Sequence, residues 1–233
     1  MTSTQTSSLS PSGESFPLPV KADYNNELKR LEELVHQARE ARKEIVVVMG
    51  LGFVGAVMAA IVADTKDASG KNSKFVIGCQ RPSPRSFWKI PLINRGEAPV
   101  KAEDPEVDIL IKRCVLDDKT LVATYNSDVL QFADCVVVDV QCDFAKKELG
   151  NMKSGEADMA ALEDTMRTIG EKIQPNCLVL IETTVAPGTT DDRRQTTEDR
   201  HRSSVIRPQS SVIGHPSFLR GQHPRLLAGV LGV

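Results

Sequence analysis

The chain has 233 residues, 40% of them hydrophobic, and a formal net charge of −2 at pH 7, which suits one large domain or one domain with tails. The near-neutral charge and the lack of any block of five or more like charges argue against a nucleic-acid partner. No apolar run approaches the ~18 residues of a membrane-spanning helix, and the Ser/Thr/Pro-rich start (residues 1–19) lacks the pattern of a secretory signal.

The cysteines are widely spaced and form no Cys-x-x-Cys pair. Several lie in or beside apolar runs, as small core residues do. We therefore expect a reduced, cytoplasmic protein without a disulfide framework and without a metal site. The residues concerned are Cys79, Cys114, Cys135, Cys142 and Cys177.

Two segments precede the first strand signal. Residues 1–22 are expected to be disordered. Over residues 23–43, Leu28, Leu31 and Leu34 recur at helical spacing among acids and bases, which predicts a charged helix. We expect this helical extension to pack across the edge of the domain; a free, solvated helix is the alternative.

A glycine-rich turn follows the strand predicted over Glu44–Met49 and precedes the helix predicted over Phe53–Asp64. Strand, Gly-x-Gly-x-x-Gly turn and helix together form the geometry that cradles a dinucleotide pyrophosphate. Gly50 permits the tight turn, Gly52 lets the backbone approach the phosphates, and Gly55 lets helix and strand pack closely. A tight turn with no ligand is the alternative.

The start of that helix supplies the remaining part of the predicted cofactor site. At Phe53 and Val54 the first turn offers free N–H groups and a partial positive charge to an anion.

Strand and helix signals continue to alternate through residue 190, and the strands read as apolar runs buried on both faces. This pattern predicts an α/β fold of the Rossmann type, a doubly wound parallel sheet over residues 44–190. The further predicted strands are Phe75–Cys79, Thr120–Thr124, Cys135–Val140 and Cys177–Ile181, and the further predicted helices are Asp104–Cys114, Asn126–Phe132 and Ala157–Ile173.

Residues 191–233 differ in character from the rest of the chain. They contain seven arginines and no lysine, and their hydrophobic periodicity is lost until Leu226. We expect an irregular tail, either a disordered extension or, as we favour, a translation out of frame.

Four segments in order resemble the nucleotide-sugar dehydrogenase family, the UDP-glucose and GDP-mannose dehydrogenases. They are the glycine turn, a loop reading L-I-N-R-G-E-A-P-V, the start of the Cys135 strand, and a run reading I-E-T-T-V-A-P-G-T-T, at residues 49–55, 92–100, 133–138 and 181–190. The resemblance covers about residues 44–190, the N-terminal NAD-binding domain of that family.

The resemblance implies an oxidoreductase that converts the sugar alcohol of a UDP- or GDP-sugar to a carboxylate. Two hydrides pass to NAD, through an aldehyde and a thioester on a cysteine of a second domain. No such cysteine setting is recognisable here, so we expect a chain truncated before that domain. The alternative is an inactive dinucleotide-binding fragment that acts only by binding or by subunit association; a homo-oligomer is left open.

The resemblance also implies a catalytic residue, Glu182, which in the family helps to place the water that cleaves the thioester. At the carboxyl end of the last strand, a fixed carboxylate can orient and partly deprotonate a water. The alternative is a carboxylate that only hydrogen-bonds neighbours such as Thr183. Thr184 is a candidate cofactor contact, or a cap of the following turn.

Two strand ends depart from the family pattern. After the Cys135 strand, Phe144 stands where the family has a threonine, and Gln141 is the residue that can keep a polar contact with the cofactor. After the Phe75 strand, Gln80 replaces the usual acid, and it can hydrogen-bond a ribose without repelling a 2′-phosphate, which Arg81 could attract. We expect NAD, with NADP as the alternative.

Overall fold

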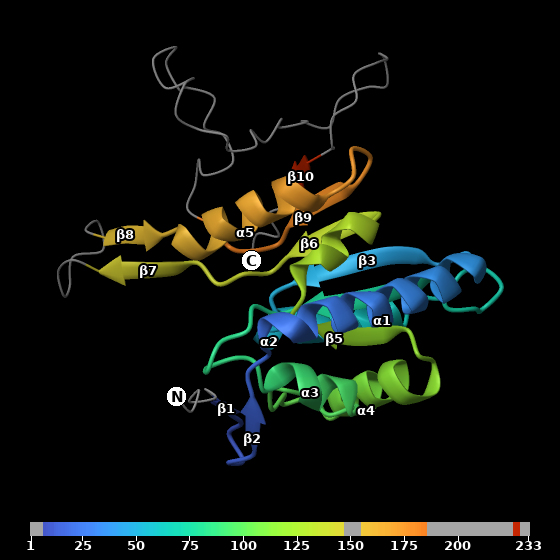
Figure 1. Ribbon diagram of the computed structural model, residues 1–233, viewed down its shortest axis with the longest axis horizontal. Coiled ribbons are helices and arrows are strands. Elements are labelled where there is room, and N and C mark those ends of the chain that lie inside the picture. The colour runs from blue at the N-terminus through green and yellow to red at the C-terminus, as the bar shows by residue number, and fades with distance from the viewer. Residues whose placement is uncertain (1–6, 147–154, 186–225, 229–233) are drawn as a thin grey trace, which may run out of the picture.

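The computed structural model describes residues 7–146, 155–185 and 226–228 (Figure 1). At its centre is a six-stranded sheet in which every pairing is parallel and the strand order is β5-β4-β3-β6-β9-β10. Numbered along the chain, this order is 3-2-1-4-5-6, that of the doubly wound dinucleotide-binding fold. The predicted fold class is confirmed. The strands are β3 (Glu44–Met49), β4 (Lys74–Cys79), β5 (Leu121–Thr124), β6 (Cys135–Val138), β9 (Leu178–Ile181) and β10 (Leu226–Ala228).

Helices cover both faces of the sheet, which explains why its strands are continuous apolar runs. One face packs against α1 (Lys21–Glu40), the 3₁₀ turn η2 (Ser127–Phe132) and α5 (Ala160–Lys172). The other face packs against α2 (Phe53–Ala63), α3 (Lys89–Asn94) and α4 (Glu106–Lys112), which continues as the π-helical turn η1 (Arg113–Asp117).

Helix α1 packs against the domain, as expected, and is not the free, solvated helix of the alternative; the surface it covers is a face of the sheet. Leu31, Val35 and Ala38 recur one turn apart, and all three are buried in the core cluster that contains β3. Arg39 near the helix end donates two hydrogen bonds to the carboxylate of Asp134, at 2.6 and 2.8 Å. The apolar stripe faces the sheet, and the charged residues between its members face solvent.

Disorder was expected over residues 1–22, and the structure differs from this expectation over residues 7–22. The strands β1 (Ser7–Leu9) and β2 (Ser15–Pro17) form an antiparallel hairpin. The hydroxyl of the fully buried Ser8 donates to the carbonyl of Pro84 at 2.8 Å and accepts from the backbone N–H of Trp88 at 3.2 Å. The hairpin is therefore ordered by contacts with a distant part of the chain, which a local pattern does not reveal.

Two further differences lie near the carboxyl edge of the sheet. The predicted strand Cys135–Val140 ends at Val138, and the chain then enters an antiparallel hairpin of β7 (Asp143–Lys146) and β8 (Gly155–Asp158) that projects beyond the sheet (Figure 1). The predicted helix Ala157–Ile173 accordingly begins at Ala160.

Within the predicted tail 191–233, Leu226–Ala228 form β10, a regular strand beside β9. The remainder of that tail, and the part of the 181–190 motif beyond Val185, lie outside the described residues.

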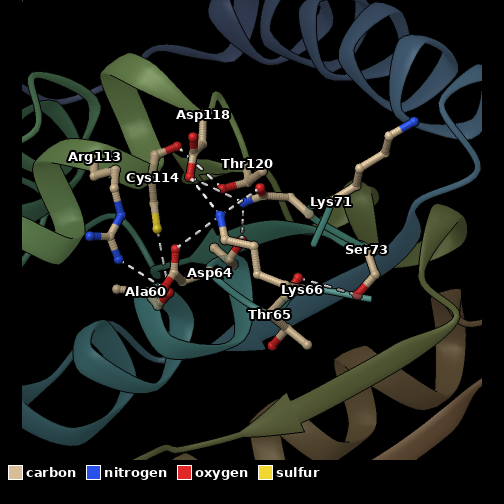
Figure 2. A network of polar contacts seen from close by, with 12 residues as sticks. Ala60, Asp64, Thr65, Lys66, Lys71, Ser73, Arg113, Cys114, Asp118 and Thr120 are labelled. Atoms are coloured by element: carbon tan, nitrogen blue, oxygen red, sulfur yellow. Dashed lines mark hydrogen bonds and ion pairs between the residues drawn. The ribbon is translucent and has the colours of Figure 1, made fainter. Parts of the chain in front are cut away.

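A polar network ties the C-terminal end of α2 to η1 (Figure 2). Arg113 donates to the Asp64 carboxylate at 2.8 Å. Lys66 Nζ lies 3.7 Å from Asp64 Oδ1 and 3.6 Å from Asp118 Oδ2. Asp64 and Lys66 lie in the connection from α2 to β4, at the amino ends of the strands. The network therefore lies at the edge of the sheet opposite to the one at which such sheets bind ligands.

Candidate cofactor site at the carboxyl edge

The β3–α2 turn has glycine at two positions where the backbone leaves no room for a side chain. Gly50 has φ +98°, and a Cβ built on it would lie 2.4 Å from the carbonyl oxygen of Asp139. A Cβ on Gly55 would lie 1.9 Å from the carbonyl oxygen of Gly50. The turn can therefore sit close to β6 and to α2 only with these glycines.

Gly52 differs from the other two because its surroundings are open. A Cβ built on it would meet no atom of the described residues within 4 Å, and its φ of −80° suits any residue. Gly52 is the N-cap of α2, and no side chain caps the helix. The exposed first turn, at Phe53 and Val54, thus presents N–H groups and the positive end of the helix dipole to open space, a setting that fits a pyrophosphate.

Gln80 follows β4 and holds the turn in place. Its side-chain oxygen accepts from the backbone N–H of Leu51 at 2.8 Å, and the N–H of Gly50 donates to the carbonyl of Cys79 at 2.9 Å. The amide nitrogen of Gln80 carries the donors that a ribose oxygen could accept from. Gln80 is therefore a support of the turn as well as a candidate ligand residue.

Arg81 lies beside Gln80 but is paired with another element. Its guanidinium donates to the carboxylate of Asp164, on α5, at 3.0 Å, and 78% of the Arg81 side chain is exposed. A 2′-phosphate would have to compete with this ion pair, which agrees with NAD rather than NADP as the cofactor.

The ends of β6 and β9 are joined by the motif that contains Glu182. The hydroxyl of Thr183 accepts from the N–H of Val140 at 3.0 Å and donates to its carbonyl at 2.8 Å, and the N–H of Glu182 donates to the carbonyl of Val138 at 2.9 Å. Glu182 is half-buried at the carboxyl edge. The Thr183 hydroxyl therefore bonds to the backbone of the segment that follows β6.

Two predicted cofactor residues are placed less favourably. The exposed Gln141 side chain donates to Asp143 at 2.6 Å. Thr184 is exposed. Neither is brought against the glycine turn by a hydrogen bond in the part of the chain that the structure describes.

The structure adds Asp139 to the candidate site residues. The sequence did not single it out, because one acid within the apolar run Cys135–Val140 was interpreted as part of the strand. Val138 pairs with Ile181 in the parallel register, so Asp139 and Glu182 are adjacent on neighbouring strands. The Asp139 Oδ2 atom is buried, has no hydrogen-bond partner among the described residues, and lies 3.1 Å from the position of a Cβ on Gly55. Burial first, and then the charge of Glu182, raise the pKa of the Asp139 carboxyl.

Other features of the described residues lie apart from this site. A cavity of about 260 Å³ between α1, η2 and the start of β9 is at the opposite edge of the sheet. The described cysteines are free, and burial raises the pKa of the Cys79 thiol to about 12, as suits a core residue. Over the described ranges, no helix is long and apolar enough to span a membrane, and no cluster of three metal-binding side chains forms.

The family loop at residues 92–100 has a structural use in this chain. The Asn94 amide donates to the carbonyl of Ala123 at 2.9 Å and accepts from its N–H at 2.7 Å, so it binds the outer side of β5. Arg95 forms a bidentate ion pair with Glu14 of the N-terminal hairpin.

Comparisons with known proteins agree with this site. Residues 44–224 match the model of the UDP-glucose/GDP-mannose dehydrogenase family, NAD-binding domain, which extends beyond the expected limit at residue 190. UDP-N-acetyl-D-mannosamine dehydrogenase of Pyrococcus horikoshii is 30% identical over 146 residues, 63% of this chain and 30% of the relative.

Two solved structures are also similar. The NDP-N-acetyl-D-galactosaminuronic acid dehydrogenase of Methanosarcina mazei is 33% identical with a TM-score of 0.56, covering 70% of this chain and 32% of the other. A ternary complex of GDP-mannose dehydrogenase from Pseudomonas aeruginosa is 28% identical with a TM-score of 0.50, covering 63% and 30%. The chain thus spans about a third of the length of these relatives. It belongs to the UDP-glucose/GDP-mannose dehydrogenase family and carries the domain with which that family binds its cofactor, NAD.

Proposed function

We propose that this chain is the cofactor-binding part of an NAD-dependent dehydrogenase that oxidises the sugar alcohol of a UDP- or GDP-sugar to a carboxylate. The observation that carries the proposal is the position of Glu182. It stands at the same carboxyl edge as the glycine turn, on the strand beside β6, where a doubly wound sheet binds its ligands. The nucleotide sugars named for the similar proteins support this substrate class.

In this proposal each described residue has a limited role. NAD, when bound, accepts the hydride. The uncapped first turn of α2 and the open space at Gly52 receive its pyrophosphate, and Gln80 holds the turn. Glu182 orients a water and takes part of its proton, and its backbone is fixed by the hydrogen bond to Val138.

The acyl-carrying cysteine of the family belongs to a second domain, and we place that step outside residues 1–233. The experiment is steady-state oxidation of UDP- and GDP-sugars by the protein encoded by the full gene, followed by NADH absorbance. Glu182→Gln should lower kcat by about 10²- to 10⁴-fold, the usual contribution of one proton-transferring side chain. Unchanged kcat would remove Glu182 from the mechanism.

A second candidate is an inactive chain that binds NAD without oxidising a sugar, since no cysteine in the setting that the resemblance implies is recognisable within residues 1–233. The 233-residue chain itself tests it. NAD binding without NADH production from any nucleotide sugar supports the fragment, whereas steady NADH production by this chain contradicts it.

The origin of residues 191–233 is part of the same question. We propose that this segment is translated out of frame, although the family match through residue 224 and the pairing of β10 with β9 favour the alternative, an extension in the same frame. Sequencing the coding DNA through codon 190 and beyond tests this: another frame that continues the fold and shows a Gly/Ser-flanked cysteine supports the proposal, and the absence of any such frame contradicts it.

A further inference from the structure

The Asp139 carboxyl occupies an unusual place in the NAD site. It follows β6, the strand beside β3 at the point where the strand order reverses, and its backbone N–H donates to the carbonyl of Met49 at 2.9 Å. Val137 packs in the same core cluster as α2, so Asp139, two residues later, faces α2 as well. This places the carboxyl beneath the first turn of α2.

No group in the described part of the chain donates a hydrogen bond to Asp139 Oδ2. It is buried and lies 3.1 Å from the position of a Cβ on Gly55, the third residue of α2. A buried carboxylate that receives no hydrogen bond loses the hydration of its charge, which costs free energy. The neutral carboxyl does not carry this cost, so burial favours the protonated form.

The surrounding charges also favour the neutral form of the Asp139 carboxyl. The adjacent strand contributes Glu182, and the turn and helix α2, residues 50–63, contain no titratable side chain. Burial and Glu182 together raise the pKa of Asp139. A dinucleotide pyrophosphate at the first turn of α2 would add further negative charge close to this carboxyl.

We propose that Asp139 is a proton-linked residue of the cofactor site: the chain binds NAD with the Asp139 carboxyl neutral, and it takes up a proton there when binding begins from the ionised form. This inference rests on NAD occupying the glycine turn. A neutral carboxyl removes the repulsion of the cofactor's phosphates and offers them an O–H donor.

The consequence is a pH dependence of binding with a definite sign. Below the pKa of Asp139 in the free chain the carboxyl is already neutral, and affinity is independent of pH. Above that pKa, binding requires protonation, so the affinity falls by up to about tenfold per pH unit. The window begins above the ordinary carboxyl pKa of about 3.9, because the Asp139 pKa is raised.

The test is titration calorimetry of the full 233-residue chain with NAD, from about pH 5 to about pH 8, in pairs of buffers that differ in ionisation enthalpy. Such pairs count the protons taken up on binding. We expect the native chain to take up part of a proton at the upper end. Asp139→Asn should bind with no proton uptake and no loss of affinity as the pH rises, because its neutral amide replaces the neutral acid at nearly the same volume.

Two matched variants make the assignment specific. Asp143→Asn changes an exposed acid of the same edge and should leave proton uptake unchanged. Glu182→Gln removes the charge that acts on Asp139, so the onset of proton uptake should move to lower pH.

The opposite results would overturn the inference. Proton uptake that persists in Asp139→Asn assigns the proton to another group, and binding of NAD to the native chain without pH dependence shows that Asp139 is not linked to the cofactor. Failure of the native chain to bind NAD at any pH would overturn the site itself, and this inference with it.

Discussion

The three glycines of the turn occupy unlike surroundings, although the motif treats them alike. Gly50 and Gly55 are required by close backbone contacts within the free chain, whereas Gly52 faces open space. The motif therefore identifies the turn, but only the structure separates the two glycines that close backbone contacts require from the one that faces open space.

This difference predicts a separation of binding from stability. Gly52→Val should weaken NAD binding by at least tenfold, or about 1.4 kcal/mol, because the side chain fills the space of the pyrophosphate. The melting temperature without NAD should change little, since a Cβ there meets no atom within 4 Å. Gly55→Val should lower it strongly, because its Cβ would lie 1.9 Å from Gly50 O. Differential scanning fluorimetry with and without NAD measures the stability of each variant and its response to NAD. Equal destabilisation by Gly52→Val and Gly55→Val would contradict the different roles given to the two glycines.

Gln80 holds the glycine turn through its hydrogen bond from the Leu51 N–H, and two substitutions there should differ in their effect on stability. Gln80→Leu leaves the N–H of Leu51 without its acceptor and should cost about 1–3 kcal/mol in the free energy of unfolding, with a loss of NAD affinity. Gln80→Glu keeps an acceptor at the same reach and should fold with native stability. Urea unfolding compares the variants, and a Leu variant as stable as the native chain would show that the 2.8 Å bond holds nothing in place.

At the scale of elements, the sequence predicts best what local periodicity determines. The strand Glu44–Met49 is found with its predicted limits, and α2 ends within one residue of its prediction. The N-terminal hairpin was missed because long-range contacts order it: Ser8 bonds residues about 80 positions away. Asp139 was missed for a related reason, since its importance comes from Gly55 and Glu182 and not from its neighbours in sequence.

The N-terminal hairpin carries a prediction of its own, with a built-in reporter. Ser8→Ala removes the acceptor of the Trp88 N–H and should release the hairpin at a cost of about 1–3 kcal/mol. Trp88 is the single tryptophan of the chain and is 8% exposed, so its fluorescence should shift to longer wavelength when the hairpin leaves. Ser7→Ala, on the exposed side of the same strand, is the control. An unshifted spectrum in Ser8→Ala would show that the hairpin is held by its other contacts.

At the scale of the whole molecule, β3 and β6 separate β4 from β9 in the sheet, yet Arg81 after β4 forms an ion pair with Asp164 on α5, the helix before β9. The sequence could locate Arg81 after a strand, but not its partner, because the two residues are 83 positions apart and their meeting depends on the folded sheet. The guanidinium that is our candidate contact for a 2′-phosphate is therefore paired with a residue of a distant helix.

This connection predicts how the chain distinguishes the two nicotinamide cofactors. At a hundredfold excess over its Kd, NAD should stabilise the native fold by about 2.7 kcal/mol, and NADP at the same concentration should stabilise it less. Asp164→Asn releases Arg81 from its partner, so it should raise the affinity for NADP by several-fold and leave that for NAD nearly unchanged. Asp158→Asn, an exposed acid just before the same helix, is the control. Thermal shifts measured with NAD and with NADP test this prediction. A stronger response of the native chain to NADP, or an Asp164→Asn variant with an unaltered preference for NAD, would show that the Arg81–Asp164 pair does not determine which cofactor binds.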